Sequence, residues 1–139
     1  MASMSFATQS ENHWVFHTAG QKVSQIVLDY GVSFQLESEV LVRIEAPFVL
    51  RTNSQEQWKL TPGDGAEEFA PILSALHSVA GDWRATDDGR LELSFFSGIS
   101  IEVLPSSDYE AWQIVAPDGA RYVGGPGARV TAWSGVALH

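Results

Sequence analysis

The sequence contains no cysteine, and this absence removes several kinds of chemistry before any motif is considered. Disulfide bonds, zinc sites with thiolate ligands, iron–sulfur clusters and thiol catalysis are all excluded. A chain of 139 residues is still long enough to fold around one hydrophobic core without such cross-links. A cytoplasmic location is compatible with the lack of cysteine, and it is the location that we expect.

Long apolar runs are also missing. No run exceeds five residues, the length reached at residues 46–50, whereas a membrane-spanning helix needs about 20. Residues 1–11 contain no Lys or Arg and no apolar centre, so they do not resemble a signal peptide. We therefore predict a disordered leading segment over residues 1–11, a single β-rich domain over residues 12–139, and no membrane partner.

Positive charge is scarce, because eight Lys and Arg stand against 17 Asp and Glu, a formal net charge of −9. The excess lies in residues 61–110, where ten acids stand against two bases, a net charge of −8. Nucleic-acid binding needs a basic surface for phosphates, so that class is excluded. An acidic segment instead favours a protein partner with a basic surface, through electrostatic steering. The alternative is that these acids only keep the protein soluble.

Apolar and polar residues alternate in four short stretches, which is typical of strands with one face in water. The stretches are residues 32–37, 42–46, 91–95 and 99–103. Two hairpins are predicted from residues 48–50 with 58–60 and from residues 112–115 with 121–123. Residues 124–127 are then expected to form a loop, and residues 129–133 a final strand.

The predicted strands resemble two copies of one unit. A shift of 57 residues places Phe34 on Leu91 and Val42 on Ile99, so that inward positions match inward positions. We predict an internal duplication in which residues 23–60 and 80–123 form two similar antiparallel β-meander units.

One helix is predicted between the two units, over about residues 67–79. Its apolar stripe has the spacing i, i+3, i+4 and i+7 and consists of Phe69, Ile72, Leu73 and Leu76. Gly81 is the expected stop. The predicted fold class is therefore mainly β (α+β), with this helix packed on the sheet.

The segment Asp108-Tyr109-Glu110-Ala111-Trp112 is the densest group of functional side chains. Asp108 and Glu110 would lie on one side of an extended segment. Tyr109 is of a residue type that anchors protein interfaces, and Trp112 would support the loop from the core. Two alternatives remain: a capping or other structural role, and acid–base catalysis by the two carboxylates.

The neighbouring acids Asp87 and Asp88 precede Gly89 in a predicted turn. We expect them to steer a basic partner together with the later segment. The predicted partner-binding residues are thus Asp87, Asp88, Asp108, Tyr109, Glu110 and Trp112.

Signatures of catalysis and of metal binding are weak. His13 and His17 are four residues apart, but they lie in a strand-like stretch without a third ligand, so no metal is expected. No nucleophile elbow or phosphate-binding loop is present. We predict that the protein is not an enzyme and uses no cofactor. The five Trp residues either fill the core or line an aromatic pocket.

Several short words in the sequence resemble a known family. They are His13-Trp14, the stretches 19–23 and 46–48, residues 70–73 and, most distinctively, Tyr109-Glu110-Ala111-Trp112. The family consists of small acidic bacterial proteins with a domain of unknown function, and the resemblance covers about residues 13–133. It implies no activity or cofactor. Small acidic single-domain proteins of this kind are associated with immunity to secreted toxins.

The leading hypothesis is a non-enzymatic, acidic protein-binding module, most concretely an immunity or inhibitor protein for a toxin or enzyme with a basic surface. The first alternative is a small-ligand-binding domain, or a weak enzyme, with an aromatic cleft between the two repeats. The second is a homo-oligomeric assembly protein, such as a homodimer that pairs through an exposed sheet edge.

Overall fold

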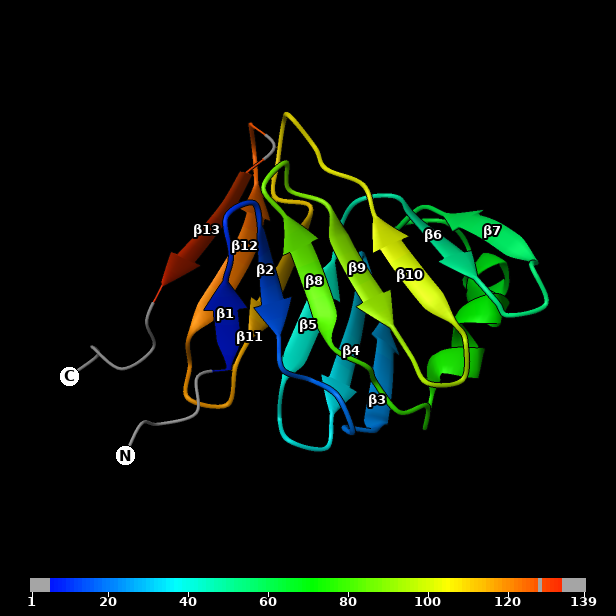
Figure 1. The fold of residues 1–139 in the computed structure, drawn as a ribbon. Coiled ribbons are helices and arrows are strands. Elements are labelled where there is room, and N and C mark those ends of the chain that lie inside the picture. Colours follow the sequence, from blue (N-terminus) through cyan, green and yellow to red (C-terminus); the bar gives the residue numbers. More distant parts are fainter. Residues whose placement is uncertain (1–5, 128, 134–139) are drawn as a thin grey trace.

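The computed structural model describes residues 6–127 and 129–133. Two antiparallel sheets face each other, one of seven strands and one of six (Figure 1). A short 3₁₀ helix lies beside them. The mainly β class predicted from the alternating sequence is therefore confirmed.

The seven-stranded sheet has two edge strands, β1 and β7. In spatial order its strands are β1 (Ala7–Gln9), β2 (His13–Phe16), β8 (Trp83–Thr86), β9 (Leu91–Ser94), β10 (Ser100–Val103), β6 (Phe48–Arg51) and β7 (Gln57–Leu60). The six-stranded sheet is ordered β13 (Arg129–Trp133), β12 (Arg121–Gly125), β11 (Trp112–Val115), β5 (Leu41–Ile44), β4 (Val32–Leu36) and β3 (Val23–Leu28).

The predicted alternation matches the burial of the strands. In β4, Val32, Phe34 and Leu36 are buried, whereas Ser33 and Gln35 are half-buried on the other side. The two predicted hairpins also form, since β6 pairs with β7 and β11 pairs with β12. A period of two places every second side chain between the sheets, which is what a half-buried strand requires.

The core between the sheets is aromatic and aliphatic. Its largest fully buried side chains include Trp83, Trp112, Phe16, Phe34 and Phe48. Burying one large apolar side chain contributes about 1.5–3 kcal/mol. The prediction that Trp residues fill the core is therefore confirmed for two of the five. Two more, at positions 14 and 58, are partly buried and pack against the same core.

The strand order joins the two predicted units in a reciprocal way. Residues 23–60 contribute β3, β4 and β5 to the six-stranded sheet and β6 and β7 to the other sheet. Residues 80–123 contribute β8, β9 and β10 to the seven-stranded sheet and β11 and β12 to the six-stranded one. The last strand of each meander pairs with the first strand of the other hairpin, in β5–β11 and β10–β6.

Two boundaries differ from the sequence prediction. Part of the leading segment predicted to be disordered forms β1, because the Phe6 ring packs 5.8 Å from Phe16 and 5.9 Å from Tyr122. Residues 1–5 lie outside the described residues. The predicted loop at residues 124–127 begins later, because Gly124 and Gly125 continue β12 and pair with β13.

The helix also differs from its prediction. A 3₁₀ helix, η1, spans Ala66–Ala75 instead of an α-helix over residues 67–79. With three residues per turn, Phe69, Ile72 and Ala75 fall on one face, and all three are buried. Leu73, assigned to the apolar stripe by an α-helical period, is 58% exposed.

The helix packs beside the sandwich rather than on the outer face of a sheet. The ring of Phe69 lies 6.4 Å from that of Phe48, the first residue of β6. After the helix, the chain returns to the edge of β3, where the His77 N–H donates to the Val23 carbonyl. Within residues 6–127 and 129–133, no helix has the length and apolarity to cross a membrane.

The period of the helix can be tested by two single substitutions. We expect Ile72→Ala to lower the free energy of unfolding by about 2–5 kcal/mol, because it removes a fully buried side chain. Leu73→Ala should change it by less than about 0.5 kcal/mol, because that side chain is mainly in water. Urea denaturation measures both, and equal losses would contradict the 3₁₀ assignment.

Candidate functional site

Trp112 connects the two sheets at one end of the sandwich. Its side chain is 1% exposed, and its indole Nε1 donates a hydrogen bond of 2.8 Å to the carbonyl of Gly89. Trp112 begins β11 in the six-stranded sheet, whereas Gly89 lies in the turn between β8 and β9 of the other sheet. Trp112 was predicted among the partner-binding residues, but its burial limits it to supporting the loops around it.

Gly124 makes room for this indole. The register of β11 and β12 places Gly124 opposite Trp112. A Cβ atom on Gly124 would lie only 2.2 Å from the Trp112 Nε1. The position therefore requires glycine, because any side chain would displace the indole from its bond to Gly89.

Asp88 closes the turn between β8 and β9. Its Oδ1 accepts hydrogen bonds from the Thr86 hydroxyl and, at 3.2 Å, from the Arg90 N–H. Its Oδ2 lies 3.3 Å from the Arg90 guanidinium. The Thr86 hydroxyl is the main cause that holds the pKa of Asp88 below its ordinary value, and Arg90 adds to it. The hydrogen-bonding capacity and the charge of the Asp88 carboxylate are thus used within its own turn.

Asp87 is the more available of the two acids. Its backbone N–H donates to the Asn12 carbonyl at 3.1 Å, which ties the turn to the β1–β2 connection. Its side chain is exposed and forms no ion pair within the described part of the chain.

The loop before β11 is bent rather than extended. The Ser106 hydroxyl accepts hydrogen bonds from the N–H groups of Asp108, at 3.1 Å, and of Tyr109, at 3.3 Å. The extended segment expected for Asp108 and Glu110 is therefore not present, because this hydroxyl closes a bend at residues 107–109. Asp108 and Glu110 are exposed, and Tyr109 is 47% exposed.

Further acids lie at the same end. Arg43 of β5 contacts Asp29 at 3.0 Å and Glu45 at 2.9 Å. The Glu45 N–H donates to the Ala111 carbonyl, which brings this group beside the loop before β11. The pKa of Asp29 is held below its ordinary value, first by the Gly31 N–H and then by Arg43. These partners offset the charge of Asp29.

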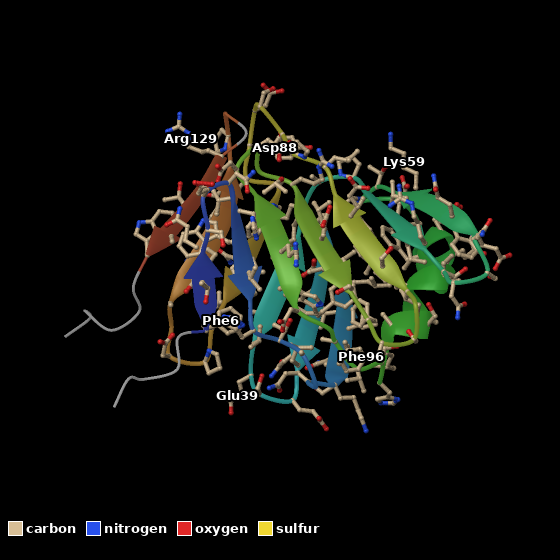
Figure 2. All side chains as sticks on the ribbon, in the orientation of Figure 1. Phe6, Glu39, Lys59, Asp88, Phe96 and Arg129 are labelled. Atoms are coloured by element: carbon tan, nitrogen blue, oxygen red, sulfur yellow. The ribbon has the colours of Figure 1, made fainter. Side chains whose placement is uncertain are left out.

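We call this region the acidic end. Figure 2 shows Asp88 at this end and Glu39 at the opposite end. The structure brings together the two sequence clusters at residues 87–88 and 108–110, which the Trp112 bond to Gly89 joins. The acidic end consists of Asp29, Tyr30, Glu45, Asp87, Asp88, Asp108, Tyr109 and Glu110.

Sequence reasoning missed three of these residues, namely Asp29, Tyr30 and Glu45. In the sequence, Tyr30-Gly31 indicates only a turn before the alternating residues 32–37. In the structure Tyr30 stands at the tip of the β3–β4 turn and is 90% exposed. The available signal was an aromatic residue beside a turn glycine.

A depression of about 210 Å³ lies on the outer face of the six-stranded sheet at the acidic end. It is lined by Arg43, Glu45, Glu110, Trp112 and Gln113. Two carboxylates, an amide and the Arg43 guanidinium thus surround a small open space. Glu45 is paired with Arg43, so Glu110 is the carboxylate there that is available to a cationic side chain.

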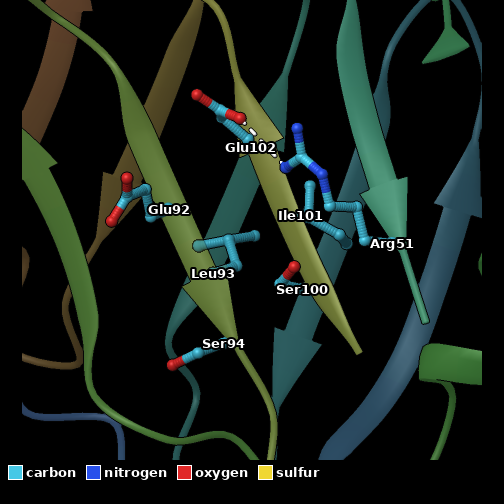
Figure 3. Close-up of a pocket in the computed structure, with 7 residues that line it drawn as sticks. All are labelled: Arg51, Glu92, Leu93, Ser94, Ser100, Ile101 and Glu102. Atoms are coloured by element: carbon cyan, nitrogen blue, oxygen red, sulfur yellow. Dashed lines mark hydrogen bonds and ion pairs between the residues drawn. The ribbon is translucent and has the colours of Figure 1, made fainter. Parts of the chain in front are cut away.

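A second depression, of about 220 Å³, lies on the outer face of the seven-stranded sheet (Figure 3). Glu102 is bound there by Arg51 at 3.0 Å and by Arg90 at 3.3 Å. Glu92 lies opposite Glu102 in the β9–β10 register. The Ser94 hydroxyl donates to the Asp82 carbonyl at 3.0 Å, so it is not poised beside a base as a nucleophile.

The two histidines considered as metal ligands have other contacts. His17 Nε2 lies 2.7 Å from the Thr8 hydroxyl, and His13 Nδ1 lies 3.1 Å from the Asn12 side-chain oxygen. Across residues 6–127 and 129–133, no three His, Asp or Glu side chains are placed to hold a metal ion.

The packing of Trp112 against Gly124 predicts that alanine substitution at two adjacent glycines changes the free energy of unfolding by very different amounts. We expect Gly124→Ala to lower the free energy of unfolding by about 1–3 kcal/mol, because its Cβ overlaps the indole. Gly125→Ala is the matched control: nothing lies within 4 Å of its Cβ, and the change should stay within about 0.5 kcal/mol. Urea denaturation followed by Trp fluorescence measures both, and equal effects would contradict this packing.

The lowered pKa of Asp88 predicts a pH-dependent contribution to stability. Because folding favours the ionised carboxylate, its contribution is present above about pH 4 and is lost as pH falls through the lower pKa of the folded state. We expect Asp88→Asn to be less stable than the wild type at pH 7 and equally stable near pH 2. A difference that did not change with pH, in urea titrations, would contradict this role.

Comparison with known proteins places the chain in a family. No curated protein and no solved structure shows a significant match to it. Residues 14–134 match a family described as a family of unknown function, DUF6188, and this match covers most of the chain. The chain therefore belongs to the DUF6188 family.

Proposed function

We propose that this protein is a non-enzymatic binding module whose acidic end engages a basic surface on a protein partner. Its most concrete form is an immunity or inhibitor protein that occludes a functional site on a toxin or enzyme. The observation that carries the proposal is the acidic end itself, where exposed acids from separate loops lie at the same end of the sandwich as two exposed tyrosines.

The charge available to a partner is concentrated in three of the acids. Asp87, Asp108 and Glu110 are exposed and form no ion pair with a described residue. Asp29, Glu45 and Asp88 are paired to Arg43 or Arg90. The three unpaired carboxylates would steer and pair with Lys or Arg of the partner.

Tyr30 and Tyr109 supply the apolar area that such an interface needs. Tyr30 is 90% exposed and Tyr109 is 47% exposed. A tyrosine offers a large rigid ring with a hydrogen-bonding tip, and such residues dominate the binding energy of many interfaces. The Tyr109 loop leads into Trp112, which is fixed by its bond to Gly89, and the Tyr30 turn is closed by the Gly31 N–H, which donates to the Asp29 carboxylate. Both loops therefore support binding with little ordering cost.

The other predicted properties are consistent with this role. We propose that the protein acts in the cytoplasm of a bacterium, where a cysteine-free chain needs no oxidising environment. We also propose that residues 23–60 and 80–123 arose by duplication. The reciprocal strand order of the two units supports this, because each contributes a three-strand meander to one sheet and a hairpin to the other.

The experiment is affinity capture from an extract of the organism that encodes the protein, followed by titration with the purified captured protein. We expect the affinity to fall at least about tenfold between about 50 mM and about 500 mM salt. The triple variant Asp87→Asn, Asp108→Asn, Glu110→Gln should cause a similar loss at low salt. For the inhibitor form, the wild type should also suppress the activity of the captured enzyme or toxin.

The matched control removes the same charge elsewhere. Glu37→Gln, Glu39→Gln and Glu56→Gln neutralise three exposed acids on turns away from the acidic end, and binding should change less than about twofold. Equal losses for the two triple variants would mean that only the overall charge matters. No captured partner, or binding indifferent to salt, would reject the proposal.

A further inference from the structure

β13 is an edge strand of the six-stranded sheet. Among residues 6–127 and 129–133 it pairs with β12 only, over residues 129–133, so no described residue covers its outer side. Its last residue, Trp133, is 51% exposed, and the strand contains no acidic residue. Unpaired backbone groups along such an edge are a template for pairing with another strand.

The hydrogen-bond pattern identifies which backbone groups are free. The Ala116 N–H donates to the Ala120 carbonyl. The backbone N–H and C=O groups of every second residue of β12, counted from Ala120, therefore point toward β11. The residue of β12 opposite Thr131 then faces β13, so Thr131 is bonded within the sheet. The N–H and C=O groups of Val130 and Ala132 therefore point away from the sheet.

We propose that β13 pairs antiparallel with β13 of a second copy of this chain, across a two-fold axis at Thr131. Val130 then lies opposite Ala132 of the second copy, and their outward groups form four N–H···O=C bonds in all. This register uses the whole strand. It joins the two six-stranded sheets into one continuous sheet.

The side chains of β13 complement themselves in this register. Arg129, Thr131 and Trp133 alternate with Val130 and Ala132, so they share one face of the strand. Each Arg129 lies opposite Trp133 of the second copy, which places a guanidinium against an indole twice in the dimer. Val130 and Ala132 meet on the other face and remove apolar surface from water.

The charge distribution also selects this edge. Two copies that each carry a net charge of −9 repel each other wherever acids gather. β12 and β13 carry Arg121 and Arg129 and no acid. β13 is therefore a surface on which two acidic molecules can meet.

The other edges are less suited to pairing. β1 has three residues, and β7 carries Lys59, a residue type that protects edges. Part of β3 is already covered, because the Val23 N–H and C=O are bonded to Ser78 and His77.

The dimer would present two acidic ends. In this pairing the two-fold axis is perpendicular to the joined sheet. The strands of the two molecules therefore run in opposite directions, and the two acidic ends point in opposite directions. Each acidic end remains open, so one dimer can hold two partner molecules. The pairing itself does not depend on the proposed function, because it involves none of the residues of the acidic end.

A disulfide test suits a chain with no cysteine of its own. In the proposed register Thr131 lies opposite Thr131 of the second copy in a non-hydrogen-bonded pair, with Cα atoms about 4.5 Å apart. Thr131→Cys should therefore form a disulfide-linked dimer on mild oxidation. Val27→Cys, at the centre of the free part of β3, is the matched control and should stay mainly monomeric on a non-reducing gel.

Sizing by light scattering and sedimentation provides the second measurement. The wild type should have twice the monomer mass, and Trp133→Ser should raise the dimer dissociation constant about tenfold through the loss of two cation–π contacts. Ala132→Pro removes only an outward N–H, so it should give a folded monomer, checked by circular dichroism. Leu28→Pro makes the same change at β3 and should leave the dimer intact.

Each outcome decides the proposal. A wild type that stays monomeric at about 0.5 mM would overturn it, because that concentration exceeds the dissociation constant of a specific dimer. Faster linking of Val27→Cys than of Thr131→Cys, or a monomer from Leu28→Pro but not from Ala132→Pro, would also overturn it. If a proline variant fails to fold, hydrogen exchange of the Val130 amide provides the test instead. Exchange that slows as the protein concentration rises would support the proposal, because the dimer bonds this N–H.

Discussion

The hydrogen bond from the Trp112 indole to the Gly89 carbonyl is the contact on which the acidic end depends. It joins the first residue of β11, in one sheet, to a turn of the other sheet. Because the bond is buried, losing it would leave a backbone carbonyl without a partner, at a cost of about 1–3 kcal/mol. Gly124 has no side chain where the indole lies, so three separated parts of the sequence meet in one contact.

The same contact explains why acids that are distant in sequence lie at one end of the molecule. Residues 61–110 hold most of the excess negative charge, but the fold divides it. Glu102 lies on the outer face of the seven-stranded sheet, where Arg51 and Arg90 compensate it. Asp87 and Asp108 lie at the acidic end without such partners. Acids of the same acidic segment therefore differ in their environment, because Glu102 is compensated on a sheet face whereas Asp87 and Asp108 are not compensated at the acidic end.

The strands were predictable because a period of two is a local property that burial of one face imposes. The helix was not, because positions 69 and 72 fit both an α-helical and a 3₁₀ period, and only the folded chain shows that Ala75 is buried whereas Leu73 is exposed. β1 was missed because Phe6 gains its neighbour Tyr122 only in the folded chain. Tyr30 was missed because its turn lies beside Glu45 only after β4 and β5 have paired.

The sequence by itself determined the excluded thiol chemistry, the two-residue period of the strands, and the segments in which the acids and Tyr109 lie. These follow from residue type and local spacing. Only the tertiary structure decided that the Trp112 indole binds the Gly89 carbonyl of the other sheet, and that Asp29, Tyr30 and Glu45 lie at the same end. Burial and contact across sheets depend on strand order, and the pairing energies that set strand order involve residues far apart in the chain.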